Sequence, residues 1–414
     1  MNSKLLVKAY SLMLAVLMIF TVSGCGNKPT HSASSNNSSV TRPGATESSD
    51  NDSSVNTDSS DNSSGSNSNS NSSKSYNDAV NSGSKVSTVT TVTKDVKYDA
   101  DKNPLKRGMN FSNFEMHNSI GYDNWIFQAK YYDMLREKGF DHVRLPVDFF
   151  DYMDLDNAPN YPIDEEALRM IDTIVNTALS AGLKIILDFH HFGVLQKEFT
   201  ANRAKYLKLW EQLSIHYQNY PSGLIFEVFN EPGNPNTVKK APDPINPTRI
   251  MLIQEEAIKI IRKTNPTRLI VHATKLNNAV SMLNETTLPD DENIIMSVHV
   301  YDPYVFTHQG TTWLGPEYSG KCAYSDEVRV EIEKAFAEIS EYQEKTGRPV
   351  WIGEFGVTDK AEKQDRYKYA ELVNELSKKY KVGWCWWEFS SGFGVYNIEK
   401  NAWTEDGVIE ALTK

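Results

Sequence analysis

The chain has 414 residues and carries 54 Asp and Glu against 43 Lys and Arg, which gives a formal net charge of −11 at pH 7. This acidic balance argues against nucleic acid or an anionic surface as a partner, because both repel a negatively charged protein. A neutral ligand fits the charge better.

The first 25 residues have the pattern of an export signal. Lys4 and Lys8 precede an apolar stretch, 12–22, that is short for a membrane span and ends at small residues. The run Val22-Ser23-Gly24-Cys25 resembles a bacterial lipobox, which implies cleavage before Cys25 and a diacylglycerol on its sulfur. An ordinary secretory signal or an uncleaved anchor helix is the alternative. In each case we expect the protein on the outer face of the bacterial membrane or secreted.

Residues 26–85 consist mostly of Ser, Asn, Asp, Gly and Thr, with almost no large apolar side chain. Such a segment cannot bury enough surface to offset its chain entropy, so we expect a disordered tether that acts as an inert spacer. The segment 86–104 is a lead-in to the next domain. Its Thr- and Val-rich part, 86–96, is compatible with an edge strand or with a plug beneath a barrel.

Two further cysteines lie in different surroundings, Cys322 in a polar loop and Cys385 in an apolar strand. An exported compartment permits a disulfide between them, but their spacing does not require one. We expect two free thiols.

Residues 105–414 have the right size for one α/β barrel or for two smaller domains. Short β-rich runs alternate with amphipathic helical patterns. Several runs are apolar throughout, as in Ile185-Ile186-Leu187, which is typical of a parallel sheet covered on both faces. The predicted strands are Arg107–Ser112, His142–Val147, Lys184–His190, Leu224–Asn230, Arg268–Ala273, Ile294–Tyr301, Val350–Phe355 and Val382–Phe389.

Helical patterns separate these strands. One runs from Asp164 to Ala181, with Asp164 as a plausible N-cap and Gly182 just past the end. The other predicted helices are 123–138, 202–217, 248–264, 326–346 and 361–380.

Periodicity alone does not separate a closed barrel from an open doubly wound sheet. Polar residues, however, gather at the carboxyl ends of the predicted strands, and in a barrel those ends form one rim where active sites lie. We therefore expect a (β/α)8 TIM barrel. Such strand ends include Val143-Arg144-Leu145-Pro146, Asp188-Phe189-His190-His191, Asn230-Glu231-Pro232, His299-Val300-Tyr301, Glu354 and Trp386-Trp387-Glu388.

Two of these strand ends carry a glutamate, Glu231 and Glu354. A carboxylate at the end of a buried strand is costly unless it has a partner, so it usually has a function. Structural carboxylates paired with an arginine or a backbone amide are the alternative. Two such glutamates are the minimum needed to cleave a glycosidic bond.

The region 105–414 resembles glycoside hydrolase family 5 and the related barrel glycosidases. Each matching piece is weak alone, but six in the right order, each at a strand end, are specific. The pieces are Gly139–Pro146, Leu187–His191, Phe229–Pro232, His299–Tyr301, Ile352–Gly356 and Trp387–Phe389.

The resemblance implies that Glu231 is the acid/base and Glu354 the nucleophile. Arg144 and Tyr301 would hydrogen-bond Glu354 and keep it ionised, and Asn230 would contact a sugar 2-hydroxyl. The remaining implied sugar contacts are His190 and His299 in the cleavage subsite, Trp387 as its stacking floor, then His191, Asn113 and Glu388, with Trp313 at the edge of the cleft.

These roles agree with elementary electrostatics. A guanidinium lowers the pKa of the nucleophile, whereas burial and the nearby Glu354 charge raise the pKa of Glu231. Strands four and seven lie nearly opposite one another, so we predict carboxyl groups about 5–5.5 Å apart and retention at the anomeric carbon.

Neither a metal nor a cofactor is expected. His190 and His191 are adjacent on a strand and point to opposite faces, so both cannot readily bind one ion. No glycine-rich phosphate loop follows a strand.

The function we expect is that of a lipid-anchored, monomeric, retaining endo-β-1,4-glucanase that acts on β-glucan polysaccharide or oligosaccharide. The same chemistry on mannan, xyloglucan or mixed-linkage glucan is the alternative within this class. A surface lipoprotein that binds glycan without cutting it is the alternative from another class.

Overall fold

The computed structural model describes residues 103–112 and 128–414, and for residues 235–236, at the start of a short helix, it describes the backbone alone. The expected export signal with Cys25, the tether 26–85 and all but the end of the lead-in 86–104 lie outside the described residues. Within the described part of the chain, no helix is both long and apolar enough to cross a membrane.

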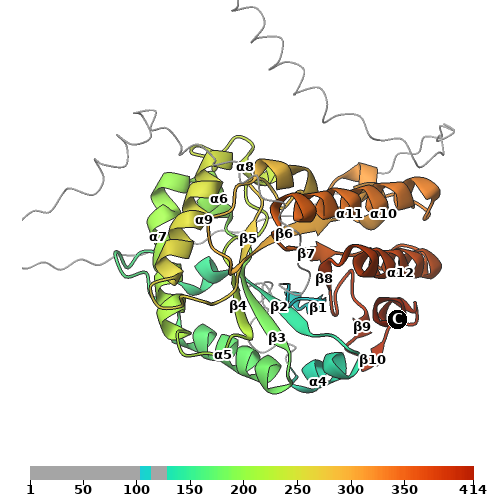
Figure 1. Ribbon diagram of the computed structural model, residues 1–414, viewed down its shortest axis with the longest axis horizontal. Helices are drawn as coiled ribbons and strands as arrows, with labels where there is room; N and C mark the ends of the chain where they lie inside the picture. Colours follow the sequence, from blue (N-terminus) through green and yellow to red (C-terminus); the bar gives the residue numbers. More distant parts are fainter. Residues whose placement is uncertain (1–102, 113–127) are drawn as a thin grey trace, which may run out of the picture. The chain divides into compact units, whose positions relative to one another are not determined.

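Eight parallel strands form a closed barrel in which each strand pairs with its neighbours in chain order and β1 pairs with β8. This confirms the TIM barrel and excludes the open sheet. Figure 1 shows the strands in the centre with the long helices around them. The strands are β1 (Arg107–Asn110), β2 (His142–Val147), β3 (Lys184–Phe189), β4 (Leu224–Glu227), β5 (Ile270–Ala273), β6 (Ile294–Val300), β7 (Val350–Phe355) and β8 (Gly383–Trp386).

Strands β2 and β7 have the predicted bounds, whereas the other six are shorter than predicted. The largest differences are in β4, which ends at Glu227 rather than Asn230, and in β8, which ends at Trp386 rather than Phe389. After β4 the chain must leave the extended conformation, since Glu231 has a positive φ of 37°. The polar residues of the rim therefore lie just beyond the strands.

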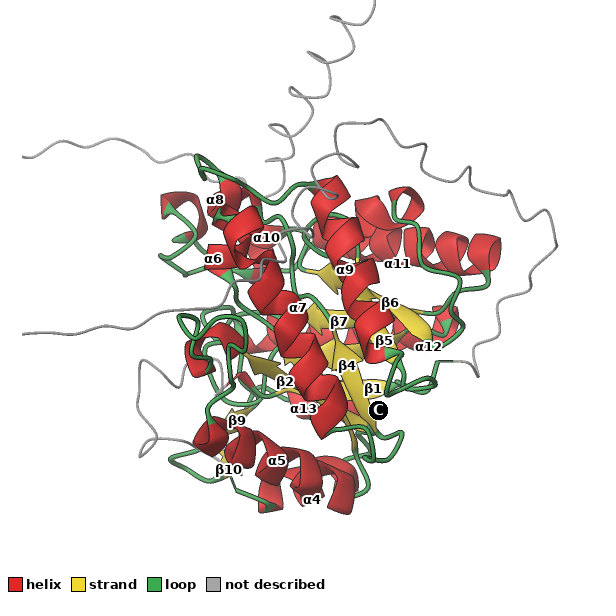
Figure 2. Ribbon diagram, turned by 90° about the vertical axis from the view of Figure 1, so that its left-hand side faces the viewer, coloured by secondary structure: helices red, strands yellow, loops and turns green. Residues whose placement is uncertain are grey.

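The long helices pack on the outside of the barrel (Figure 2). Five follow predicted segments, and a sixth begins in a segment of which 123–127 is not described. Between β5 and β6 the chain forms only the 3-10 helix η5 (Val280–Glu285), in agreement with the absence of a helical pattern there. The helices are α4 (Lys130–Glu137), α5 (Glu165–Ser180), α7 (Phe199–His216), α9 (Pro247–Ile261), α11 (Asp326–Thr346) and α12 (Lys363–Tyr380).

Shorter elements lie in the loops and at the end of the chain. None of them was predicted, because a turn or two of helix has too few residues for a periodic signal. They are η4 (Phe149–Tyr152), α6 (Gly193–Lys197), α8 (Pro235–Val238), α10 (Tyr304–Thr307), η6 (Pro316–Tyr318), the hairpin β9 (Tyr396–Asn397) and β10 (Ala402–Trp403), and α13 (Val408–Thr413).

The inside of the barrel changes from apolar to charged toward the carboxyl ends of the strands. A small apolar cluster separate from the main core takes one residue from each of β3 to β8, together with Leu105. Arg144 on β2 and Glu227 on β4 are also fully buried. Burying these charges is costly unless they are paired, so the barrel interior already indicates an ionic network.

The cysteines differ from the expectation of two free thiols. Cys385 is a buried free thiol in the apolar cluster. Cys322 is disulfide-bonded, so the expectation is wrong for this residue. Pairing depends on which segments meet in space, and the spacing of cysteines along the chain does not reveal that.

Candidate active site

Glu354 is the next-to-last residue of β7 and is held by two donors. Arg144 Nη1 lies 2.8 Å from Glu354 Oε1, and the Tyr301 hydroxyl donates to Oε2 at 3.0 Å. Glu354 is 5 % exposed and Arg144 is fully buried. Both hydrogen bonds implied by the resemblance are present.

Arg144 also binds two carboxylates that were not predicted. Its Nε donates to Glu227 Oε2 at 2.6 Å, and its Nη2 lies 2.9 Å from Asp188 Oδ2. With Glu354, three carboxylates face one guanidinium. Burial, and then the charges of Glu227 and Glu354, raise the pKa of Asp188 well above its usual value despite Arg144. A proton on Asp188 would reduce the excess of carboxylates over the single guanidinium of this network from two to one.

Asn230 is oriented by the same guanidinium. Arg144 Nη2 donates to Asn230 Oδ1 at 2.7 Å, and Nη1 donates to Asn110 Oδ1 at 3.1 Å. Because the amide oxygen of Asn230 faces Arg144, its Nδ2 points the other way and remains the donor of this side chain.

Glu231 lies just beyond β4, and its carboxylate meets His299. Nδ1 of His299 is 2.8 Å from Glu231 Oε1 and 3.6 Å from Glu354 Oε2. Burial raises the pKa of Glu231, although the charges of His191 and Arg144 partly offset it. Burial also lowers the pKa of His299 to about 4, so at neutral pH the imidazole is uncharged. Glu231, with its raised pKa, thus contacts an uncharged imidazole that also lies near Glu354.

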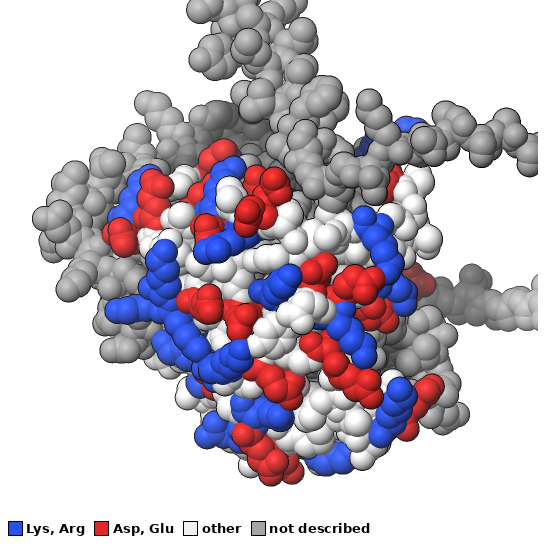
Figure 3. Space-filling view, turned by 90° about the vertical axis from the view of Figure 1, so that its right-hand side faces the viewer, with Lys and Arg blue, Asp and Glu red and all other residues white. Residues whose placement is uncertain are grey.

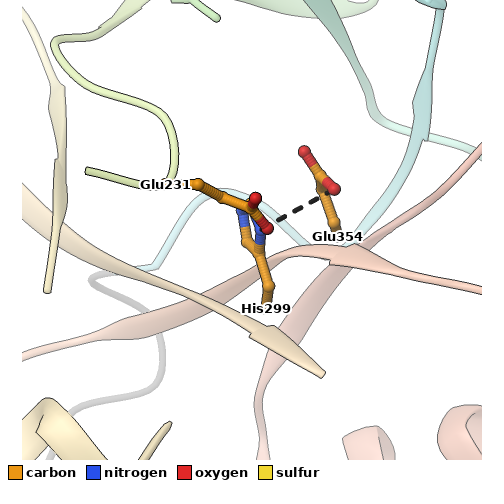
Figure 4. Close-up of side chains that lie close together, drawn as sticks. All are labelled: Glu231, His299 and Glu354. Atoms are coloured by element: carbon orange, nitrogen blue, oxygen red, sulfur yellow. Dashed lines mark hydrogen bonds and ion pairs between the residues drawn. The ribbon is translucent and has the colours of Figure 1, made fainter. Parts of the chain in front are cut away.

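Glu231 and Glu354 face each other across a short gap (Figure 4). One oxygen of each carboxylate and one nitrogen of His299 all lie within 4.8 Å of one another. Such a cluster has donors for a cation, but Arg144 and Tyr301 already occupy both oxygens of Glu354. A guanidinium 2.8 Å from Oε1 also repels a second positive charge. The donor set therefore fits a pair of catalytic carboxylates better than a metal.

His190 and Trp387 form one wall of the site. Their rings stack with centroids 5.5 Å apart and planes within 4° of parallel. Nδ1 of His190 is 2.6 Å from Asp188 Oδ2, and burial lowers the pKa of His190 well below its usual value. Trp387 is partly exposed, whereas Trp384 and Trp386 are buried, as expected for packing residues.

His191 and Glu388 differ strongly in exposure. The His191 side chain is 64 % exposed, and its imidazole lies 3.3 Å from Asp148. Glu388 is buried and accepts a hydrogen bond from the Ser112 amide at 3.3 Å. Burial raises the pKa of Glu388 to about 8, so this carboxyl group is mostly neutral at pH 7.

Asn113, another expected sugar contact, lies outside the described residues. Trp313 is 68 % exposed and meets His308 edge to face at 5.6 Å. His308 in turn packs against Tyr301 at 4.9 Å. Trp313 is thus linked to Tyr301 through the ring of His308, and its place at the edge of the cleft stays a prediction.

Three groups of this site were missed by sequence reasoning: Glu227, Asp188 in its pairing role, and Asn278. Glu227 lies inside a run that the sequence predicts as an apolar strand, and a lone carboxylate in such a run is itself a signal for a buried partner. Asn278 accepts a hydrogen bond from the Glu231 amide at 3.0 Å and lies in the loop after β5, where no motif marks it.

A parallel eight-stranded barrel that carries two facing carboxylates on its rim, one of them held by Arg and Tyr, is the architecture of a barrel glycosidase. The comparison with protein families gives the same result. The family model for cellulase (glycosyl hydrolase family 5) matches residues 98–392. The chain belongs to glycosyl hydrolase family 5, and it is a glycoside hydrolase.

Curated relatives carry endoglucanase names. The chain is 27 % identical to Endoglucanase B of Clostridium cellulovorans over 350 residues, which covers 79 % of this chain and 78 % of the relative. It is 28 % identical to Endoglucanase H of Acetivibrio thermocellus over 247 residues. That match covers 60 % of this chain but spans only 25 % of the relative.

Solved structures show the same fold. The clostridial cellulose synthase subunit Z of Clostridioides difficile is 33 % identical with a TM-score of 0.66, over 75 % of this chain and 100 % of that one. A hyperthermophilic endo-β-1,4-glucanase in complex with substrate is 30 % identical with a TM-score of 0.69, over 76 % and 99 %. Thermotoga maritima Cel5A in complex with mannotriose is 30 % identical with a TM-score of 0.68, over 76 % and 99 %.

Proposed function

We propose that the protein is a retaining endo-β-1,4-glucanase that works by double displacement. The observation that carries the proposal is the pair Glu231 and Glu354, with facing oxygens within 4.8 Å and only Glu354 bound by a guanidinium. Retaining glycosidases have carboxyl groups about 5–5.5 Å apart, whereas inverting ones leave a wider gap for water.

In the first step Glu354 attacks the anomeric carbon and forms a glycosyl ester. The bond from that carbon to the glycosidic oxygen breaks, and the proton of Glu231 goes to the leaving oxygen. Burial raises the pKa of Glu231, so this group holds its proton more firmly than an exposed glutamate does. Asn230 has Nδ2 free to donate to the 2-hydroxyl, because Arg144 occupies its oxygen.

In the second step water replaces Glu354 at the same carbon. Formation of the ester removes the negative charge of Glu354, so Glu231 loses its proton more readily and acts as the base. Glu231 takes a proton from water, the ester bond breaks, and Glu354 returns to its hydrogen bonds with Arg144 and Tyr301. Two inversions restore the β configuration.

The names of the relatives support β-1,4-glucan as the substrate. The mannotriose complex of the Thermotoga maritima structure keeps mannan as an alternative. The net charge of −11 favours a neutral polysaccharide of either kind over an anionic one. On the face drawn in Figure 3, basic and acidic side chains are interspersed, without a large area of one sign.

A panel of polysaccharides with release of reducing sugar tests this proposal. We expect activity on soluble β-1,4-glucan and near-complete loss in Glu354→Gln, with the matched variant Glu341→Gln on α11 unaffected. A wild type that releases nothing from glucan, mannan or xyloglucan would contradict it and favour the non-catalytic glycan-binding protein.

Azide distinguishes the nucleophile from other essential residues. In Glu354→Ala the emptied site admits azide, which attacks the anomeric carbon directly, so we expect partial recovery on an activated aryl cellobioside. The product expected by NMR is the α-glycosyl azide. Absence of rescue, or a β-azide, counts against Glu354 as the nucleophile.

We also propose that the protein is exported and that a lipid on Cys25 anchors it outside the cytoplasm wherever this sulfur is not paired. Besides the free Cys385, Cys25 is the one other cysteine of this chain available to the disulfide of Cys322, and a sulfur that carries a lipid cannot form it. The lipobox-like run Val22-Ser23-Gly24-Cys25 supports the lipid anchor. In cells, Cys25→Ser should leave activity intact and move it from the membrane fraction to the medium. Membrane-bound activity in this variant would show that the lipid is not the anchor.

A further inference from the structure

The backbone of Glu231 is strained. Its φ of 37° lies in the left-handed region, which is uncommon for a residue other than glycine. Such a conformation persists only where neighbouring groups hold it. The groups that hold it here come from the loop that follows β5.

Two consecutive asparagines of that loop bind the Glu231 segment. The Asn277 amide donates to the Pro232 carbonyl at 2.7 Å. Oδ1 of Asn278 accepts from the Glu231 amide at 3.0 Å. Both asparagines have positive φ, 52° and 48°, a conformation that asparagine tolerates better than most residues.

Asn278 also fixes the partner of the acid/base. Its carbonyl accepts from the His299 amide at 2.8 Å, and its Nδ2 donates to the Ser297 carbonyl at 3.3 Å. It is fully buried. One residue thus joins the backbone of Glu231 to the part of β6 that carries His299, whose ring contacts the Glu231 carboxylate at 2.8 Å.

We propose that Asn278 is a positioning residue that orients the Glu231 carboxyl group. Its effect is therefore specific to proton transfer to and from the reacting oxygens. Its side chain contacts the Glu231 backbone and β6 and touches no reacting atom. The inference rests on the role of Glu231 given above.

The test is Asn278→Gly, which keeps the left-handed backbone accessible and deletes only the side chain. The matched control is Asn401→Gly. Asn401 has a φ of 51°, is exposed between β9 and β10, and bonds Tyr396 and Lys130 instead of the site. Folding of both variants is checked by thermal unfolding.

The readout is kcat/KM for glycosylation with two leaving groups. If the Glu231 carboxyl group is misoriented, kcat/KM falls most for a leaving group that must be protonated as it departs. With cellotetraose we expect a loss of about 10- to 100-fold in Asn278→Gly. With 2,4-dinitrophenyl cellobioside the leaving group departs unprotonated, and the loss should be at least about tenfold smaller. Azide, which needs no base, should raise the turnover of the aryl substrate in this variant only.

Equal losses on the two substrates, or no loss relative to Asn401→Gly, would overturn the positioning role. If Asn278→Gly does not fold, Asn278→Asp replaces it. Aspartate keeps the acceptor oxygen but loses the donor to Ser297. We therefore expect a smaller loss of kcat/KM, which is again larger on the substrate with the poor leaving group. Equal or absent losses on the two substrates again overturn the role. A wild type inactive on both substrates refutes the proposed function itself, which separates the two failures.

Discussion

Arg144 determines the charge state of the whole site. Its guanidinium lies within 3.0 Å of carboxylate oxygens from Glu354, Asp188 and Glu227. In a buried environment such contacts compensate the cost of removing charges from water only when geometry and additional hydrogen bonds are good. Loss of Arg144 would leave several buried carboxylates unpaired, so this residue serves folding as well as catalysis.

Glu388 gives a prediction for stability against pH. The folded protein keeps this group protonated up to about pH 8, whereas a free glutamate loses its proton near 4.5. Between these values the folded state binds more protons than the unfolded state. The contribution of Glu388 to the free energy of unfolding is therefore fully present below pH 4.5. It declines as the pH rises to 8, at about 1.4 kcal/mol per pH unit.

Glu388→Gln removes this dependence. Urea unfolding between pH 5 and 8 should give a free energy of unfolding that falls less steeply than in wild type, by about 1.4 kcal/mol per pH unit. The exposed Glu341→Gln serves as the control. Parallel curves for wild type and Glu388→Gln would show that Glu388 is ionised in the folded protein.

At the scale of elements, local signals place the helix ends well. Oδ1 of Asp164 accepts from the Ala167 amide at 2.8 Å and caps α5, as predicted. Gly182 follows the helix with a φ of 79°, which only glycine adopts readily. Strand ends were placed less well, because loops of the rim leave the sheet wherever a site residue must turn inward.

The cap of α5 can be tested separately from catalysis. Asp164→Ala removes one side-chain acceptor at the helix N-terminus and should lower the free energy of unfolding by about 1 kcal/mol. The variant Glu165→Ala at the next residue removes a charge but no cap, so it should lower the free energy of unfolding by only a few tenths of this amount. Calorimetry measures both, and kcat should be unchanged. A loss in Asp164→Ala no larger than in Glu165→Ala would mean that the cap contributes little.

At the scale of the molecule, the barrel brings eight strand ends to one rim and thereby joins residues that are far apart in the chain. The number and order of the strands could be predicted, since each repeats the same buried pattern. Closure could not be predicted from periodicity, because the pairing of Arg107 with Trp384 leaves no trace in it. It was predicted instead from the polar residues that gather at the strand ends. The same limit explains the missed residues. The roles of Glu227 and Asn278 depend on partners that are distant in the sequence, so local patterns do not reveal them. Glu231 and Glu354 could be identified because strand and turn signals surround them.

The most direct test of the central claim is to trap the intermediate. An activated 2-deoxy-2-fluoro-cellobioside slows both steps, and the fluorinated ester should accumulate on an active retaining enzyme. Mass spectrometry of the intact protein should show one added fluorocellobiosyl group, which is a disaccharide, and peptide mapping should place it on Glu354. Attachment to Glu231 or elsewhere, or no adduct together with an inverted hydrolysis product, would contradict the account.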